Sequence, residues 1–102
     1  MMNYLKNYNL SDEQINNIEK LIKERGQNID TFKYDPEKIT SILDLFISMG
    51  VTNIYGIITT SPSMFRDTVR SVKNRINKYE DKNELARLLN EDANNLSLVG
   101  LI

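Results

Sequence analysis

The chain of 102 residues contains no cysteine, no histidine and no tryptophan. Without cysteine it can form no disulfide, no thiolate metal site and no thiol nucleophile. Without histidine it lacks the side chain that most often acts as a general base or binds a transition metal. We therefore predict that the protein is not an enzyme, and we expect no catalytic residues, no metal site and no cofactor.

Glycine is sparse and long apolar runs are missing. The four glycines are scattered, so there is no glycine-rich loop of the kind that holds a nucleotide phosphate. No apolar run approaches the roughly 18 residues that a membrane-spanning helix needs. The first residues show neither the apolar stretch nor the cleavage site of a secretory signal, and a secreted domain of this size usually carries disulfides. We expect no membrane association and a cytoplasmic location.

What is present is an ordinary globular composition. With 40% apolar and 26% charged residues, the sequence can build one core, so we expect a single helical domain over residues 1–102. Asn, Lys and Ile are used heavily, as AT-rich genomes tend to produce, and this bias favours a bacterial or mobile-element source. Because the formal net charge is −1, a nucleic-acid-binding role would need a local basic patch.

Helix start and stop signals divide the first half of the chain. A capping box that begins at Ser11 precedes a helical apolar face, and Gly26 supplies a stop. Asp35 caps the next predicted helix, Pro36 occupies its first position, and Gly50 ends it. This second helix carries the widest apolar face, so we expect it to be the most buried.

Two neighbouring segments are harder to assign from the pattern. Residues 27–34 are mostly polar, and we predict a loop there with a short extended piece. Thr52 can cap a short helix over residues 54–60, where several β-branched residues also allow a strand. We favour the helix, because a strand would need a partner and only residues 29–34 could supply one.

Three more helix starts follow in the second half. Ser61 and Pro62 open the longest predicted helix, over residues 62–79. Asp81 caps another helix, and Asp92 begins a last turn or helix. The predicted fold class is therefore all-α, a single small domain of roughly five to seven short helices.

The predicted elements recur in a long–short rhythm with a spacing of roughly 30–40 residues. Residues 42–52, with the sequence ILDLFISMGVT, resemble the junction between two repeats of the mitochondrial transcription termination factor (mTERF) family. Residues 54–65, IYGIITTSPSMF, resemble the short helix of such a repeat and the proline that follows it. The resemblance extends over residues 36–79. It implies a solenoid of helical repeats that binds double-stranded nucleic acid along a basic concave surface.

Two other architectures remain open at this point. One is a plain bundle whose amphipathic helices look alike by chance. The other is a helix-turn-helix, winged or not, formed by residues 36–49 and 53–60 around Gly50. Phe46 and Gly56 then occupy positions where a small and a branched residue are expected, and no Asn-Gly or Asp-Gly pair is present to turn the hairpin of a wing.

The segment 62–79 carries the most informative charges, five basic residues against the single acid Asp67. If this segment is one helix, its basic and amide side chains form a stripe beside the apolar stripe, with Arg75 apart from them. The candidate nucleic-acid-binding residues on this stripe are Arg66, Arg70, Lys73, Asn74, Asn77 and Lys78. Cations suit phosphates and side-chain amides suit base edges.

We therefore predict a non-catalytic protein that binds double-stranded DNA through the basic helix 62–79. Only a handful of phosphate contacts per chain are available, so binding should be salt-sensitive, and a dimer would double the contacts. The same charges also fit a solvated helix face. A third interpretation is a protein–protein interaction adaptor, a homodimer or an inhibitor from a bacterial mobile element, in which the acidic segment 80–92 pairs with the basic helix of a neighbouring chain.

Overall fold

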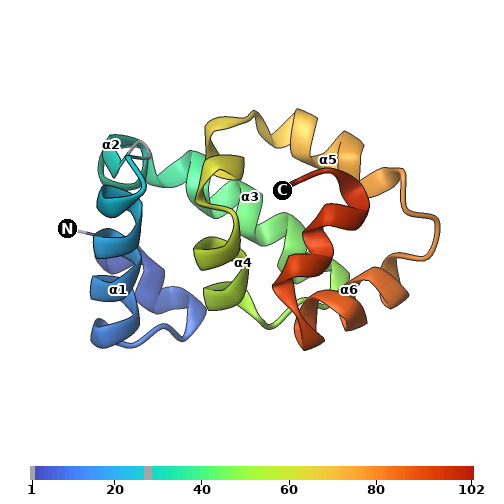
Figure 1. Cartoon of the computed structure of the whole chain (residues 1–102), viewed down its shortest axis with the longest axis horizontal. Helices are drawn as coiled ribbons and strands as arrows, with labels where there is room; N and C mark the ends of the chain where they lie inside the picture. The colour runs from blue at the N-terminus through green and yellow to red at the C-terminus, as the bar shows by residue number, and fades with distance from the viewer. Residues whose placement is uncertain (1, 27–28) are drawn as a thin grey trace.

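All the regular elements of the chain are helical in the computed structural model, which describes residues 2–26 and 29–102 (Figure 1). The α-helices are α1 (Asp12–Glu24), α2 (Ile29–Tyr34), α3 (Pro36–Met49), α4 (Ile54–Thr60), α5 (Val69–Asn77) and α6 (Lys82–Glu91). The 3₁₀ helices of the described residues are η1 (Asn3–Tyr8) before α1, η2 (Pro62–Arg66) between α4 and α5, and η3 (Ala93–Val99) after α6. The predicted all-α class is confirmed, and residues 54–60 are helix rather than strand.

Side-chain caps begin most of these helices, as their sequence signals predicted. The hydroxyl of Ser11 accepts from the amide of Gln14 at 3.1 Å, and the Gln14 side chain accepts from the Ser11 amide at 2.9 Å, which completes the capping box of α1. The carboxylates of Asp35 and Asp81 accept from the amides of Lys38 and Glu84 and so cap α3 and α6. The cap of α4 is one residue later than predicted, because Asn53 and not Thr52 accepts from the amide of the third helical residue.

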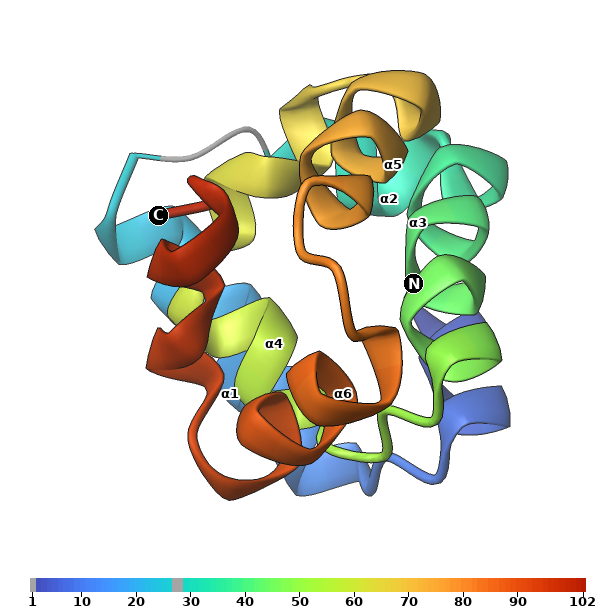
Figure 2. The same ribbon diagram turned by 90° about the vertical axis from the view of Figure 1, so that its right-hand side faces the viewer.

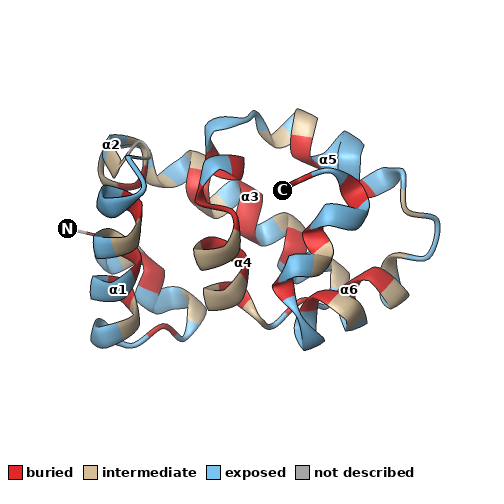
Figure 3. Cartoon of the chain, in the orientation of Figure 1, coloured by how far each residue is buried: buried red, intermediate tan, exposed pale blue. Residues whose placement is uncertain are grey.

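The core is a single cluster to which every element contributes, and α3 crosses its middle. Figure 1 shows α3 running from beside α2 to beside α6, with α5 and α6 both in the right half of the view. In Figure 2, α5 lies at the top and α6 at the bottom. The inward face of α3 is fully buried and consists of Ile39, Ile42, Leu43 and Phe46. Figure 3 shows the same inward burial along the other helices. Gly50, at φ +104°, ends α3 in a conformation that favours glycine.

The loop predicted over residues 27–34 is wrong for its second part. Residues 29–34 form α2, while 27–28 lie outside the described residues. The helix is held by a long-range contact, since Phe32 is 2% exposed and its ring meets that of Phe65 edge to face at 5.2 Å. The hydroxyl of Tyr4 also donates to the Phe32 carbonyl at 2.5 Å. Burial of one aromatic side chain thus overrides a polar local sequence.

The continuous helix predicted over residues 62–79 is also wrong. Asp67 and Thr68 are extended and separate η2 from α5, so the longest described helix is α3. The Thr68 hydroxyl accepts from the Ser71 amide at 3.1 Å and starts α5 afresh. In η2 the side chains of Met64 and Phe65 are both buried, and burying them together suits a separate short turn packed on α3 and α4.

The side chain of Asn90 on α6 holds the α3–α4 connection. The amide oxygen of Asn90 accepts from the backbone of Thr52 at 2.8 Å and of Asn53 at 3.2 Å, and its nitrogen donates to the Gly50 carbonyl at 3.1 Å. Three backbone groups that the turn leaves without helical partners are thereby satisfied. Residues 50–53 and α6, far apart in sequence, become one unit.

Asn90→Ala should therefore lower the free energy of unfolding by about 1–2 kcal/mol, since the turn loses three hydrogen bonds but water can reach the exposed site. Urea unfolding followed by circular dichroism measures this. The matched control is Asn83→Ala, which removes an exposed Asn from the same helix and should change stability by less than about 0.5 kcal/mol. Equal effects of the two substitutions would contradict the fastening role of Asn90.

Candidate nucleic-acid interface

Helix α5 presents a polar outer face because its apolar side chains are turned into the core. Val72 and Ile76 are buried against the interior, whereas the opposite side is exposed. At about 100° per residue, four predicted residues fall within roughly 100° of the helix surface. These four exposed residues are Arg70, Lys73, Asn74 and Asn77. Lys78 follows as the exposed C-cap residue.

Arg66 does not belong to this helix. It is the last residue of η2, before the break at Asp67 and Thr68, so the regular spacing that joined it to Arg70 in the sequence has no helical meaning. Its side chain is exposed, and its backbone carbonyl accepts from the Lys38 ammonium at 3.0 Å. The predicted stripe therefore divides between two elements.

A shallow cavity of about 400 Å³ lies along α5. Its lining includes three predicted residues, Arg70, Asn74 and Lys78, which follow one another at steps of four. The other lining residues were not predicted as site residues: Thr68, Ser71 and Arg75. The regular step from Ser71 to Arg75 is a signal that could have revealed part of this second row. Lys73 and Asn77 lie outside the lining.

Arg75 lines the cavity and is held by a hydrogen bond to the C-terminal part of the chain. One of its terminal nitrogens donates to the carbonyl of Gly100 at 2.8 Å, which ties α5 to the turn that follows η3. The guanidinium has further donors, so it can stabilise this turn and still present positive charge to the cavity. Sequence spacing alone set Arg75 apart from the stripe, whereas the fold brings it to the same concave surface as Arg70.

The basic side chains of residues 66–78 have no acidic partners within the described part of the chain. Among the residues that the structure describes, no carboxylate lies within ion-pair distance of the side chains of Arg66, Arg70, Lys73, Arg75 and Lys78. Ion pairs occur elsewhere, between Lys6 and Asp12, between Glu19 and both Lys23 and Lys33, and between Arg87 and both Glu84 and Glu91. Five exposed cations without an ion pair are thus concentrated between residues 66 and 78 of a protein whose net charge is −1.

Most carboxylates of the acidic segment 80–92, which follows α5 in the sequence, form hydrogen bonds within that segment or with the residues next to it. Arg87 hydrogen-bonds to Glu84 and Glu91, and the bond to Glu84 lowers the pKa of that carboxyl. Asp81 and Asp92 cap α6 and η3 through their side chains. These carboxylates are therefore occupied locally, which leaves less acidic surface for the basic helix of a neighbouring chain than the sequence suggested.

Comparisons of the chain with protein-family models, with curated proteins and with solved structures find no match. We therefore infer the function from the geometry and charge of α5. The residues from 2 to 26 and from 29 to 102 contain no group of three carboxylates placed to hold a metal ion. In the same ranges no helix has both the length and the apolar character of a membrane span.

Proposed function

We propose that this protein binds double-stranded DNA, without catalysis, through the outer face of α5 and the adjoining Arg66. The observation that carries the proposal is a set of five exposed cations on α5, its C-cap and the adjoining Arg66, none of which forms an ion pair within the described residues of this acidic protein. In this proposal Arg66, Arg70, Lys73 and Lys78 contact phosphates. Asn74 and Asn77 offer side-chain amides, which can pair with the edge of adenine in the major groove.

The dimensions of α5 suit such a contact. The helix has nine residues and is therefore about 13 Å long. An α-helix with its side chains is about 10–12 Å in diameter, so it fits the major groove, which is about 12 Å wide. Val72 and Ile76 fix the helix to the core, so the polar face is presented on a rigid element rather than on a loop. A rigid element loses little conformational entropy when it binds.

Two further features belong to the same proposal. The order of long helix α3, short helix α4 and Pro62 agrees with the resemblance to mTERF repeats and supports an architecture of that type. Composition supports a cytoplasmic location and a bacterial or mobile-element origin. The adaptor, homodimer or inhibitor function is weakened by the internal pairing of Arg87 with Glu84 and Glu91.

The test is the salt dependence of binding to a labelled random duplex, measured by fluorescence anisotropy. With about four phosphate contacts, log K should fall with log salt concentration with a slope of about −3 to −4. The triple variant Arg70→Ala, Lys73→Ala, Lys78→Ala should reduce the magnitude of the slope by about 3. A flat salt dependence, or no binding at low salt, would refute the proposal.

The matched control changes the net charge equally at another place. In the variant Lys6→Ala, Lys20→Ala, Lys23→Ala the three exposed cations come from η1 and α1, at the other end of the molecule from α5 (Figure 1). Its salt slope should match that of the parent protein. If both triple variants lose affinity to the same extent, net charge rather than α5 governs binding.

A further inference from the structure

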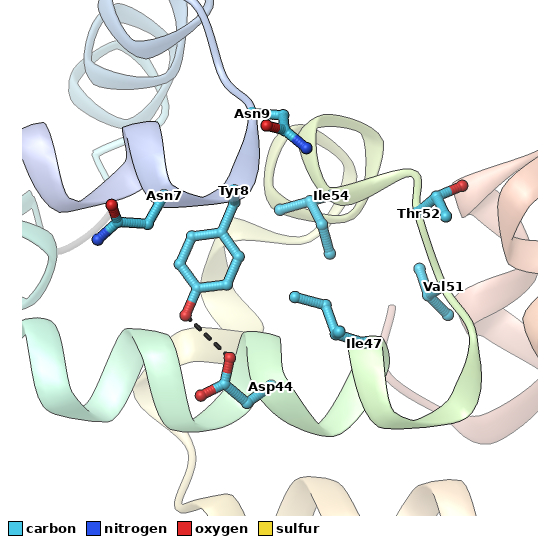
Figure 4. Close-up of a pocket in the computed structure, with 8 residues that line it drawn as sticks. All are labelled: Asn7, Tyr8, Asn9, Asp44, Ile47, Val51, Thr52 and Ile54. Carbon is cyan, nitrogen blue, oxygen red and sulfur yellow. Dashed lines mark hydrogen bonds between the residues drawn. The ribbon is translucent and has the colours of Figure 1, made fainter.

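A second cavity, of about 490 Å³, lies where η1 meets α3 and the start of α4. It shares no lining residue with the cavity along α5. Figure 4 shows the Tyr8 ring reaching from η1 toward α3, with the side chains of Ile47 and Ile54 beside it. The volume falls within the range of about 300–1,000 Å³ that is common for small-molecule sites.

The floor of this cavity is apolar and partly open. Ile47 is 44% exposed, although the inward face of the same helix is fully buried. Val51 and Ile54 also line the cavity, but they are only 2% and 5% exposed, so Ile47 rather than these two supplies the apolar surface that a ligand can cover. A ligand with an aliphatic part would therefore remove apolar surface from water here, which is the main source of affinity in such sites.

Asp44 is the one charged residue among those that line the cavity. One of its carboxylate oxygens accepts from the Tyr8 hydroxyl at 3.0 Å. Within the described ranges no cation lies within ion-pair distance of this carboxylate, and no protein donor bonds to its second oxygen. A carboxylate held in place by a phenol, with its second oxygen unused, is suited to receive a cationic donor.

Tyr8 keeps its proton in this arrangement. Burial, and next the hydrogen bond to Asp44, raise the pKa of Tyr8 to about 12. At neutral pH the phenol therefore remains a donor and holds Asp44 on the cavity wall. The neighbouring residue Asn9, in the left-handed conformation at φ +64°, completes the wall on the side of η1.

We propose that this cavity binds a small organic amine, with its ammonium group on the carboxylate of Asp44 and its aliphatic stem over Ile47. The chemistry of the lining selects the class of ligand, since it joins one unpaired carboxylate to an apolar floor. This inference does not depend on DNA binding, because the residues concerned are separate from α5.

The test is a titration of the ¹⁵N-labelled protein with hexylammonium, followed by amide chemical shifts. Hexylammonium should shift the amides of Asn9, Asp44 and Thr52 saturably, and should bind on the order of tenfold more tightly than hexanoate, which has the same stem and the opposite charge. Butylammonium should bind more weakly than hexylammonium, by roughly fourfold for each methylene that no longer contacts the floor.

Asp44→Asn should abolish the preference for hexylammonium over hexanoate while leaving an acceptor for the Tyr8 hydroxyl, so the wall keeps its shape. The matched control is Glu37→Gln, which neutralises an exposed carboxylate on the same helix outside the cavity and should leave the preference unchanged. Equal binding of the two probes to the parent protein, or shifts confined to other surfaces, would overturn the proposal. Loss of DNA binding in the α5 variant would leave amine binding unaffected, so the two proposals can fail separately.

Discussion

Phe65→Ala is expected to lower the free energy of unfolding by roughly 3–5 kcal/mol. The side chain is fully buried in η2 and makes the edge-to-face contact with Phe32 at 5.2 Å. Its removal loses the transfer free energy of the ring and leaves a cavity where η2, α2 and α3 meet. Because small domains are stable by only about 5–15 kcal/mol, this substitution should remove a large part of the total. The measurement is the urea midpoint and slope.

The exposed Tyr34 supplies the control for this substitution. It lies on α2 near Phe32, but its side chain is 80% exposed, so Tyr34→Ala should change stability by less than about 0.5 kcal/mol. In a double-mutant cycle, the variant with both Phe32→Ala and Phe65→Ala should be destabilised by about 0.5–1.5 kcal/mol less than the sum of the two single effects, because each single substitution already removes the ring contact. A loss below about 1 kcal/mol for Phe65→Ala would show that this part of the core is not packed as described.

Helix starts were predictable from the sequence because their causes are local. Ser11, Asp35 and Asp81 each accept a hydrogen bond from an amide three residues ahead, and such a pattern can be recognised without knowledge of the fold. The error at Thr52 has the same origin. Either Thr52 or Asn53 could cap α4, and Asn53 prevails because its amide nitrogen also donates to the Leu89 carbonyl at 3.1 Å.

Elements that depend on distant partners were not predictable. Helix α2 is held to η2 by the contact of Phe32 with Phe65, and no periodicity in the sequence predicts a contact between residues so far apart. The 3₁₀ helix η1 is a similar case. It is fixed by the burial of Leu5 and by the bond from Tyr8 to Asp44, neither of which belongs to a regular pattern.

The positions of the candidate DNA-binding residues could be predicted only where the predicted helix 62–79 is helical in the structure, which is within α5. Within α5 the helical spacing of about 100° per residue applies, so Arg70 and Asn74 share an exposed face as expected. The helical spacing is interrupted at Asp67 and Thr68, so Arg66 does not share that face. Arg75 reaches the cavity along α5 beside the turn at Gly100, whose carbonyl it binds. The cavity at Asp44 could not be predicted at all, since it exists only where η1 folds back on α3.

Arg70→Glu is expected to weaken duplex DNA binding by roughly 100-fold at moderate salt, because one phosphate contact is lost and a repulsion replaces it. Unfolding is not the expected cause. Arg70 is exposed and is the second residue of α5, where the helix dipole favours a negative side chain, so the variant should be at least as stable as the parent protein.

The control for this reversal is Lys20→Glu, an equal change of charge on the exposed side of α1, which should reduce affinity only slightly. Anisotropy with the same labelled duplex, together with urea unfolding of both variants, separates binding from stability. Unchanged affinity in a folded Arg70→Glu protein would remove α5 as the binding surface. A loss shared by Lys20→Glu would instead point to the overall charge of the protein. The phosphate contact is placed on the exposed face of α5, opposite the buried Val72 and Ile76, only if Arg70→Glu alone loses DNA affinity and keeps its stability.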